Sequence, residues 1–344
     1  MNNFPPLLDM IRDLISTPSV SSVEPSLNQG NSEVIELLAN WLDNSDFHVE
    51  IMHLPGAPRQ ANLIATLGSG TGGLVLSGHT DTVPYDEGKW THDPFSLTEA
   101  NSRIYGLGTS DMKSFLALAL EASREFQAGM LKEPLILLAT ADEETSMTGA
   151  RALVEQARPR ARYAVIGEPT GLRPVRMHKG ILMESIHLQG RSGHSSDPSL
   201  GNSALEAMHT VIDTLLLWRN ELQHNFRDPL FTVPVPTLNL GHIHGGDNPN
   251  RICPECELHI DLRPLPGMDA QQLRGELQHR VLESLRDTGI ETRFESLSEG
   301  VPGMETASDA AIVKLAEKLT GHAAEAAAFA TEAPYLNQLG MDTV

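Results

Sequence analysis

The strongest constraint on this chain is a polar signature that directly follows a short apolar run. Leu74-Val75-Leu76 has the pattern of a buried strand, and it leads through Gly78 into His79-Thr80-Asp81. Further along, the Gly-rich turn Tyr105-Gly106-Leu107-Gly108 precedes Asp111, which stands at the start of a predicted helix. Ligands of open α/β sheets bind in the crevice beyond the carboxyl ends of the strands. The pattern therefore predicts a sheet whose strand ends present metal ligands.

Two later apolar runs end in carboxylates in the same way. Leu135-Ile136-Leu137-Leu138-Ala139 is continuously apolar, as expected for a strand covered on both faces, and it leads into Asp142-Glu143-Glu144. Ala164-Val165-Ile166 is followed by Glu168. Strand-like and helical segments alternate up to this point, so we predict an open, doubly wound α/β domain.

The pattern changes after Gly180, where the segments follow the order β-α-β-β-α-β of a ferredoxin-like α+β unit. The expected strands cover 185–188, 236–241, 257–263 and 291–295, and the expected helices cover 202–223 and 273–285. We therefore predict a second domain at 177–298, inserted into a first domain made of 1–176 and 299–344. A helix at 308–319 is expected to resume the first domain.

Composition and charge exclude several classes of protein. The formal net charge is -20, whereas a surface that binds nucleic acid or an acidic membrane needs a basic face. The N-terminal residues lack a basic start, and no apolar stretch is long enough to span a bilayer. The only two cysteines, Cys253 and Cys256, exclude a disulfide scaffold, so we expect a cytoplasmic protein.

Imidazole and carboxylate groups without a thiolate suit zinc or a similar divalent ion in a catalytic site. A carboxylate shared by two ions would hold them about 3.5–4 Å apart, with a water that ionises near neutral pH. Of two adjacent glutamates, one could bind metal while the other takes a proton from that water. The same residues also have a simpler interpretation, because strand-end His and Asp often cap helices and a Glu pair is usually solvated. Spacing alone supports the two interpretations equally.

Four motifs in the first half of the chain resemble, in order, the di-zinc family of acetylornithine deacetylase, succinyl-diaminopimelate desuccinylase and the aminoacylases, and the resemblance continues over nearly the whole chain. They lie at 76–84, 106–113, 141–144 and 166–170. Stretches at 90–95, 193–198 and 238–246 are most similar to the acetylornithine deacetylase branch. The resemblance implies a zinc-peptidase-like catalytic domain with an inserted dimerisation (lid) domain. It also implies hydrolysis of N-acetyl-L-ornithine to L-ornithine and acetate, a step of arginine biosynthesis.

Two alternatives remain open at this point. The nearest is the same chemistry on another small N-acyl amino acid or on succinyl-diaminopimelate. The other, from a different functional class, is a non-catalytic dimeric homologue.

The resemblance implies a role for each candidate residue. The expected ligands of two divalent ions, zinc or cobalt, are His79, Asp111, Glu144 and Glu168. Asp111 would bridge the two ions, and Glu143 would be the general base. Asp81 would orient His79 through its other ring nitrogen. The peptide bond between Asp111 and Met112 is expected to be cis.

In the inserted domain, the resemblance implies that His194 reaches the active site of a partner subunit in a homodimer and stabilises an oxyanion. Alternatively, His194 is a turn residue between Gly193 and Ser195. Asn250 and Arg263 resemble contacts to the substrate carboxylate, which Arg can bind bidentately. Either residue could instead be a polar residue at a strand edge.

Three further motifs are expected to contribute little chemistry of their own. Cys253 and Cys256 have no second pair with which to form a metal site. His242 and His244 are expected in a loop that shapes the lid. Thr331-Glu332-Ala333-Pro334 resembles a family segment near the substrate pocket.

The resemblance also implies one more ligand, a His that follows a Gly-rich loop and completes the second metal site. The sequence ends at Val344 before such a residue is reached, and His322 lies too early to replace it. We therefore expect a second site formed only by Glu144 and the shared Asp111. We expect it to bind its ion weakly, with slow or absent deacetylation.

Overall fold

The structure, a computed structural model, describes residues 4–43 and 45–344. These residues form two compact units. The first unit contains the described residues up to Arg176 together with Thr306–Ala324 and Thr331–Val344, and the second contains Met177–Glu305 and Glu325–Ala330. The chain thus returns to the first unit at Thr306, somewhat after the expected position 299. The reason is that β13 (Met304–Glu305) pairs with β8 (Val175–His178) at the entrance of the second unit.

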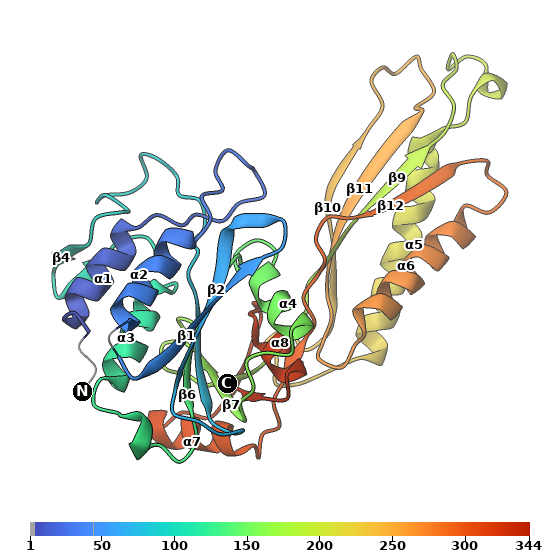
Figure 1. Ribbon diagram of the computed structural model, residues 1–344. Coiled ribbons are helices and arrows are strands. Elements are labelled where there is room, and N and C mark those ends of the chain that lie inside the picture. Colours follow the sequence, from blue (N-terminus) through green and yellow to red (C-terminus); the bar gives the residue numbers. More distant parts are fainter. Residues whose placement is uncertain (1–3, 44) are drawn as a thin grey trace. The chain divides into compact units, whose positions relative to one another are not determined.

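The first unit is built on a six-stranded sheet (Figure 1). Its strands are, in spatial order, β1 (Phe47–Leu54), β2 (Ala57–Leu67), β6 (Leu135–Thr140), β3 (Leu74–His79), β7 (Tyr163–Ile166) and β15 (Asp342–Thr343). The last four strands run parallel to one another, whereas β1 and β2 are antiparallel additions. This is the mixed sheet of a doubly wound α/β domain.

Helices cover both faces of this sheet (Figure 1). One face packs against α1 (Leu7–Ser16), α2 (Ser32–Leu42) and α3 (Lys113–Ser123), and the other against α4 (Thr148–Glu155) and α8 (Ala333–Gln338). Alternate side chains of β6 enter the two cores: Leu137 joins the first, and Ile136 and Leu138 join the second. The continuous apolar run of this strand is therefore explained by burial on both sides.

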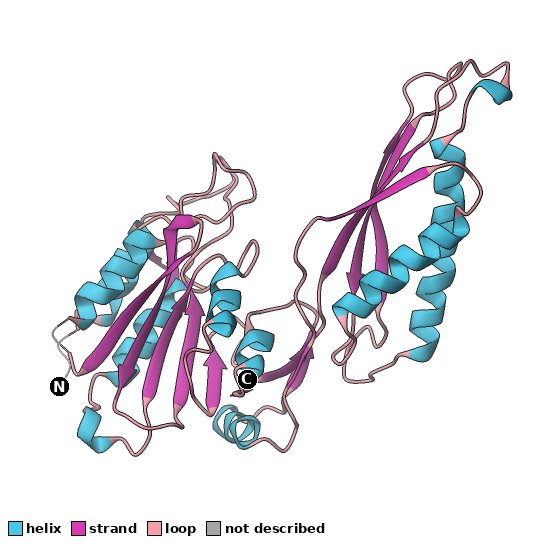
Figure 2. Cartoon of the chain, turned by 45° about the vertical axis from the view of Figure 1, so that its right-hand side comes forward, coloured by secondary structure: helices cyan, strands magenta, loops and turns pink. Residues whose placement is uncertain are grey.

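The second unit is a four-stranded antiparallel sheet with two helices on one face (Figure 2). Its strands are, in spatial order, β10 (Thr237–Gly245), β11 (Glu255–Arg263), β9 (Leu182–Gln189) and β12 (Glu291–Ser296), and its helices are α5 (Ala204–Asn225) and α6 (Ala270–Ser284). Chain order and spatial order together give the ferredoxin-like arrangement that the sequence predicted. The buried Met208, Leu215 and Trp218 of α5 pack on this sheet.

The short elements escaped prediction because they contain too few residues to show a period. They are β4 (Thr98–Ala100), β5 (Arg103–Tyr105), β8, β13, β14 (Glu325–Ala327) and α8, while α7 (Ala311–Thr320) was expected. One placement was wrong: His242 and His244 lie in β10 rather than in a loop, because that strand continues past a bulge after Leu240. Among the described residues, no helix combines the length and apolar character that crossing a bilayer requires.

Gly149 is the point of closest approach between α4 and the loop that follows β6. A Cβ atom at this position would lie 2.5 Å from the carbonyl oxygen of Ala141 and 2.5 Å from Oδ1 of Asn62. Gly149→Ala should therefore destabilise the first unit by about 1–3 kcal/mol, because the Ala141 carbonyl is main chain and the buried Asn62 amide is held by hydrogen bonds at both of its ends. Chemical denaturation followed by circular dichroism measures the change.

Gly275 in α6 provides the matched control, because a Cβ atom there would meet nothing within 4 Å. Gly275→Ala should stabilise the second unit by about 0.5–1 kcal/mol through the higher helix propensity of alanine. Equal stability of the Gly149→Ala variant and the unchanged protein would contradict the packing described for α4.

Candidate metal centre

The site forms because β3, β6 and β7 are parallel neighbours, so that their carboxyl ends share one edge of the sheet. β3 ends at His79, and β6 ends just before Asp142-Glu143-Glu144. β7 ends shortly before Glu168, and Asp111 arrives from the turn that leads into α3. Four segments far apart in the sequence therefore deliver their polar side chains to the same place.

The donor atoms of these residues lie close together. Nε2 of His79 is 2.9 Å from Oδ1 of Asp111 and 3.9 Å from Oε1 of Glu168. Two groups of three donors, each spanning no more than 4.8 Å, can be drawn: one adds Glu143 and Glu168 to His79, and the other adds Asp111 and Glu144. We call these five residues the metal cluster. Glu143, which the sequence analysis kept apart as a base, thus lies among the candidate ligands.

The ring of His79 is held in one orientation. Its Nδ1 atom lies 2.9 Å from the main-chain carbonyl oxygen of Asp81, which accepts the Nδ1–H bond and leaves Nε2 facing the carboxylates. Burial lowers the pKa of His79, but the hydrogen bond to Asp111 and the surrounding carboxylates outweigh it and raise the pKa well above its ordinary value. In the absence of a metal ion, the imidazole is therefore the natural counter-charge of the cluster.

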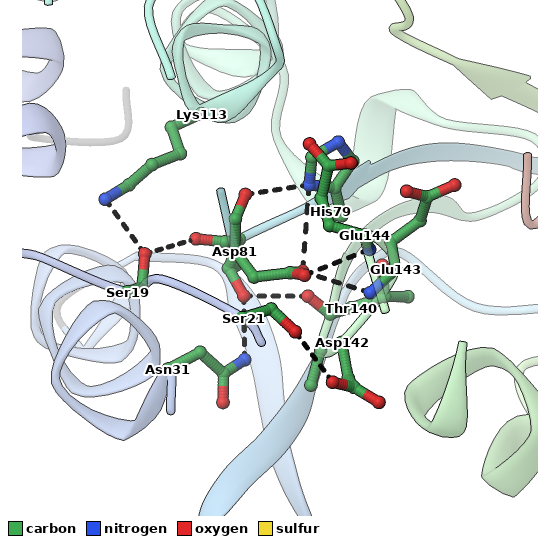
Figure 3. A network of polar contacts seen from close by, with 12 residues as sticks. Ser19, Ser21, Asn31, His79, Asp81, Lys113, Thr140, Asp142, Glu143 and Glu144 are labelled. Carbon is green, nitrogen blue, oxygen red and sulfur yellow. Dashed lines mark hydrogen bonds and ion pairs between the residues drawn. The ribbon is translucent and has the colours of Figure 1, made fainter. Parts of the chain in front are cut away.

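The carboxylate of Asp81 has a different task from the expected one. It lies 3.7 Å from Nδ1 of His79, and its two oxygens instead accept the backbone N–H bonds of Glu143 and Glu144, at 3.2 and 3.1 Å (Figure 3). Asp81 thus orients the imidazole through its main chain and fixes the Glu143-Glu144 backbone through its side chain. Sequence alone cannot distinguish these two contacts, because both come from one residue.

The three glutamates of the cluster resist ionisation. Burial raises the pKa of Glu144 and of Glu168 to about 7, with His79 opposing and Asp111 reinforcing the shift. Burial also raises the pKa of Glu143 well above its ordinary value. Buried carboxylates this close together cannot all carry charge without a nearby cation. One imidazole and several carboxylates without a thiolate fit zinc or a similar divalent ion.

A buried polar scaffold supports the cluster, and sequence reasoning missed it (Figure 3). Ser19 donates to the carbonyl oxygen of Thr80 at 2.6 Å, and the hydroxyl of Thr80 donates to the carbonyl oxygen of Thr140 at 2.7 Å. Lys113 donates to the hydroxyl of Ser19 at 3.1 Å, and burial lowers the pKa of this lysine to about 7. The only sequence signal was a lysine at an inward position of a helix.

Asp142 belongs to the same scaffold. Its φ of 63° is in the left-handed region, and its carboxylate accepts hydrogen bonds from Ser21 at 2.7 Å and from Thr148 at 2.9 Å. These bonds stabilise the sharp turn immediately before Glu143. The peptide bond between Asp111 and Met112 is cis, as the resemblance implied.

The three candidate residues of the second unit are not part of the metal cluster. His194 is exposed, with Nδ1 2.7 Å from the hydroxyl oxygen of Ser196. Its loop adjoins that of Asn250, whose carbonyl oxygen accepts the N–H bond of Ser195 at 3.0 Å. Arg263 ends β11 and forms an ion pair with Asp261 at 2.9 Å. Within the second unit, the structure therefore brings His194 and Asn250 together.

Cys253 and Cys256 are both buried and free, so they form no disulfide with each other. Burial raises the pKa of the Cys256 thiol, with the nearby Cys253 adding to the shift. The pair shows no feature of an activated thiolate.

The sequence of this chain is similar to those of known proteins. The model of peptidase family M20/M25/M40 matches residues 75–344. An acetylornithine deacetylase of Pectobacterium carotovorum subsp. carotovorum (strain PC1) is 48% identical over 337 residues, which cover 98% of this chain and 88% of that protein.

Solved structures agree in fold. The M20 family metallo-carboxypeptidase Sso-CP2 from Sulfolobus solfataricus has a TM-score of 0.70 at 17% identity, covering 99% of this chain and 90% of that one. The Bacillus subtilis YXEP protein, a dinuclear metal binding peptidase from the M20 family, has a TM-score of 0.64 at 16% identity, covering 98% and 86%. At such low identity these similarities establish the fold alone.

Asp81→Asn tests the scaffold around the cluster. An asparagine side chain has one acceptor oxygen and one NH2 donor group. One of the two backbone N–H groups of Glu143 and Glu144 would therefore lose its acceptor and face that donor group instead. We expect the affinity for zinc to fall by about 10–100-fold, as is usual when a group behind the metal ligands is lost. Competition with a chromophoric chelator measures the affinity.

Asp269→Asn is the matched control, because Asp269 caps α6 in the second unit and asparagine caps helices equally well. Its affinity for zinc should equal that of the unchanged protein. An Asp81→Asn variant that folds and binds zinc with unchanged affinity would show that the contact to the two backbone amides is unimportant for the cluster.

Proposed function

Because the chain belongs to peptidase family M20/M25/M40, we propose that its metal cluster is a di-metal centre that hydrolyses the amide bond of a small N-acyl amino acid. The observation that carries the proposal is the convergence of one imidazole and four carboxylates at the carboxyl ends of parallel strands. The substrate we assign is N-acetyl-L-ornithine, with L-ornithine and acetate as products. The relative named acetylornithine deacetylase supports this assignment through its 48% identity.

His79, Asp111, Glu144 and Glu168 would hold the ions, which we take to be zinc or cobalt. When bound, such ions polarise the amide carbonyl and provide a water that ionises near neutral pH. Because Nδ1 of His79 is committed to the carbonyl of Asp81, the single Nε2 atom can serve only one ion. Among the described residues, the other ion would rely on carboxylate donors such as Asp111 and Glu144, which fall in one candidate ligand group.

Glu143 is the residue we assign to proton transfer. It would accept a proton from the attacking water and deliver it to the leaving amine. Two observations support this role: burial raises its pKa, which suits a group that must hold a proton, and the Asp81 carboxylate fixes its backbone. The fixed backbone keeps the side chain within reach of the cluster through the whole reaction.

The proposal includes a homodimer in the cytoplasm. His194 is exposed, and its Nδ1 atom is engaged by Ser196, so Nε2 remains available to a group outside its own loop. From a second copy of the chain, this nitrogen would donate to the oxyanion formed from the amide carbonyl. Arg263 and Asn250 would contact the substrate carboxylate. Synthesis of arginine is the cellular role we infer for the reaction.

The substrate is tested by measuring acetate or succinate release by the zinc- or cobalt-loaded chain. N-acetyl-L-ornithine, other N-acetyl amino acids and succinyl-diaminopimelate are compared at equal concentration. We expect the highest kcat/KM for N-acetyl-L-ornithine. A preference for another acylated amino acid would shift the assignment to that substrate. No turnover of any of them by a chain that binds two ions would support a non-catalytic homologue.

Glu143→Gln and Glu144→Gln separate the roles of the two adjacent glutamates. Glu143→Gln should keep the affinity for zinc and lower kcat by about 10²–10⁴-fold, because the general base is lost. Glu144→Gln should weaken zinc binding first. Calorimetric titration and steady-state kinetics on both variants measure the two effects.

Glu143 also belongs to a candidate ligand group with His79 and Glu168, and this grouping predicts the opposite result. If Glu143→Gln lost an ion while Glu144→Gln kept both, Glu143 would be the ligand and Glu144 the base. The two variants make the same change of charge and size at adjacent positions, so each serves as the control for the other.

A further inference from the structure

Glu332 is a buried carboxylate beneath the metal cluster that the proposed reaction leaves without a role. It immediately precedes α8, and only 1% of its surface is exposed. Isolated ionisable groups are costly to bury, so a buried carboxylate requires strong partners and calls for an explanation. It lies in Thr331-Glu332-Ala333-Pro334, the segment that resembles a family segment near the substrate pocket.

Two buried hydroxyl groups donate to this carboxylate from neighbouring strands. Ser77 of β3 donates to one oxygen, and Thr140 of β6 donates to the other at 2.6 Å. Both hydroxyl residues are fully buried. A carboxylate is suited to this position because both of its oxygens accept, whereas a carboxamide has one acceptor and one donor group.

The two donors stand immediately before the metal cluster. Ser77 is separated from His79 only by Gly78, and Thr140 is the last residue of β6 before the turn to Glu143. In the parallel ladder, Thr140 is the register partner of His79. Glu332 therefore connects the two strand ends that carry the imidazole and the adjacent glutamates.

The charge of Glu332 also acts on the cluster. It contributes to the raised pKa of Glu143 and of Glu168, after the larger effect of burial in each case. Burial raises the pKa of Glu332 itself, and the hydrogen bonds from Ser77 and Thr140 together with the nearby His79 oppose that shift. A negative charge in this low-dielectric region attracts cations far more strongly than the same charge on the surface would.

We propose that Glu332 is a positioning residue that sets the affinity of the metal cluster for divalent cations. It joins the ends of β3 and β6 through Ser77 and Thr140, and it places a fixed negative charge behind the ligands. The inference rests on the proposed metal centre and deepens it. Glu332 touches neither substrate nor reacting atoms.

The test compares zinc affinities of full-length variants by chelator competition. Glu332→Gln removes the charge and one acceptor at nearly constant volume, and we expect zinc to bind about 10–100-fold more weakly. Glu332→Asp keeps the charge and should recover part of the affinity. The visible absorption spectrum of bound Co²⁺ should shift in Glu332→Gln, because this spectrum reports ligand geometry rather than overall stability.

Glu184→Gln is the matched control. Glu184 is equally buried, and it accepts hydrogen bonds from Arg274 at 2.8 Å and from Ser296 at 3.0 Å, but it lies in the second unit. Its zinc affinity and Co²⁺ spectrum should match those of the unchanged protein. An equal loss of affinity in Glu184→Gln would overturn the proposal, because any buried carboxylate would then have the same effect.

Unchanged zinc affinity and an unchanged Co²⁺ spectrum in Glu332→Gln would also overturn it. If that variant does not fold, Glu332→Asp and Ser77→Ala decide instead, and native affinity and spectrum in both would refute the role. A wild-type chain that binds no zinc would refute the proposed metal centre itself. Tight binding and turnover by the wild type, together with equally tight binding by Glu332→Gln, would refute only the role of Glu332.

Discussion

The alignment of the carboxyl ends of β3, β6 and β7 is the constraint on which the rest of the first unit depends. It gathers four carboxylates around His79, of which those of Glu143, Glu144 and Glu168 are partly buried and that of Asp111 is half exposed. Coulomb repulsion between such groups is strong at low dielectric, so the cluster requires protons or cations. Burial, reinforced by repulsion from Asp111, raises the pKa of Glu144 and of Glu168 to about 7.

Such a concentration of charge needs a rigid surrounding, and the structure provides it with buried hydrogen bonds. The loop between α1 and α2 is connected to the ends of β3 and β6 through Ser19, Thr80 and Thr140. Asp81 fixes the backbone of the paired glutamates. Each of these groups would cost about 1–3 kcal/mol if it were buried without a partner. Saturating them therefore stabilises one arrangement of the ligands over all others.

The sheets of the two units are buried in different ways. The sheet of the first unit is covered by helices on both faces, so its central strands carry apolar side chains on both sides up to their polar carboxyl ends. The sheet of the second unit carries helices on one face only, and its strands alternate accordingly. In β11, the buried Leu258 and Ile260 alternate with the half-buried Glu257 and His259. These two patterns are why the change in architecture could be recognised from sequence.

The sequence by itself predicted the two sheets, the long helices and the polar residues at the strand ends, because each depends on a local pattern. The metal-binding roles of those polar residues came instead from the resemblance to a known family. Apolar runs predict strands, and the polar residues after Gly78 and after Ala139 mark where two of these strands end. In open parallel sheets, ligands generally bind beyond the carboxyl ends of the strands. The short strands β8 and β13 escaped prediction, since two to four residues carry no period.

Only the tertiary structure decided which atom of Asp81 faces His79. The same holds for the hydrogen bond from Lys113 to Ser19 and for the connection of Ser77 to Thr140 through Glu332. These contacts connect residues far apart in the chain, and each depends on how elements pack rather than on what any one segment contains. A hydrogen bond between distant segments exists only once the sheet has brought its partners together.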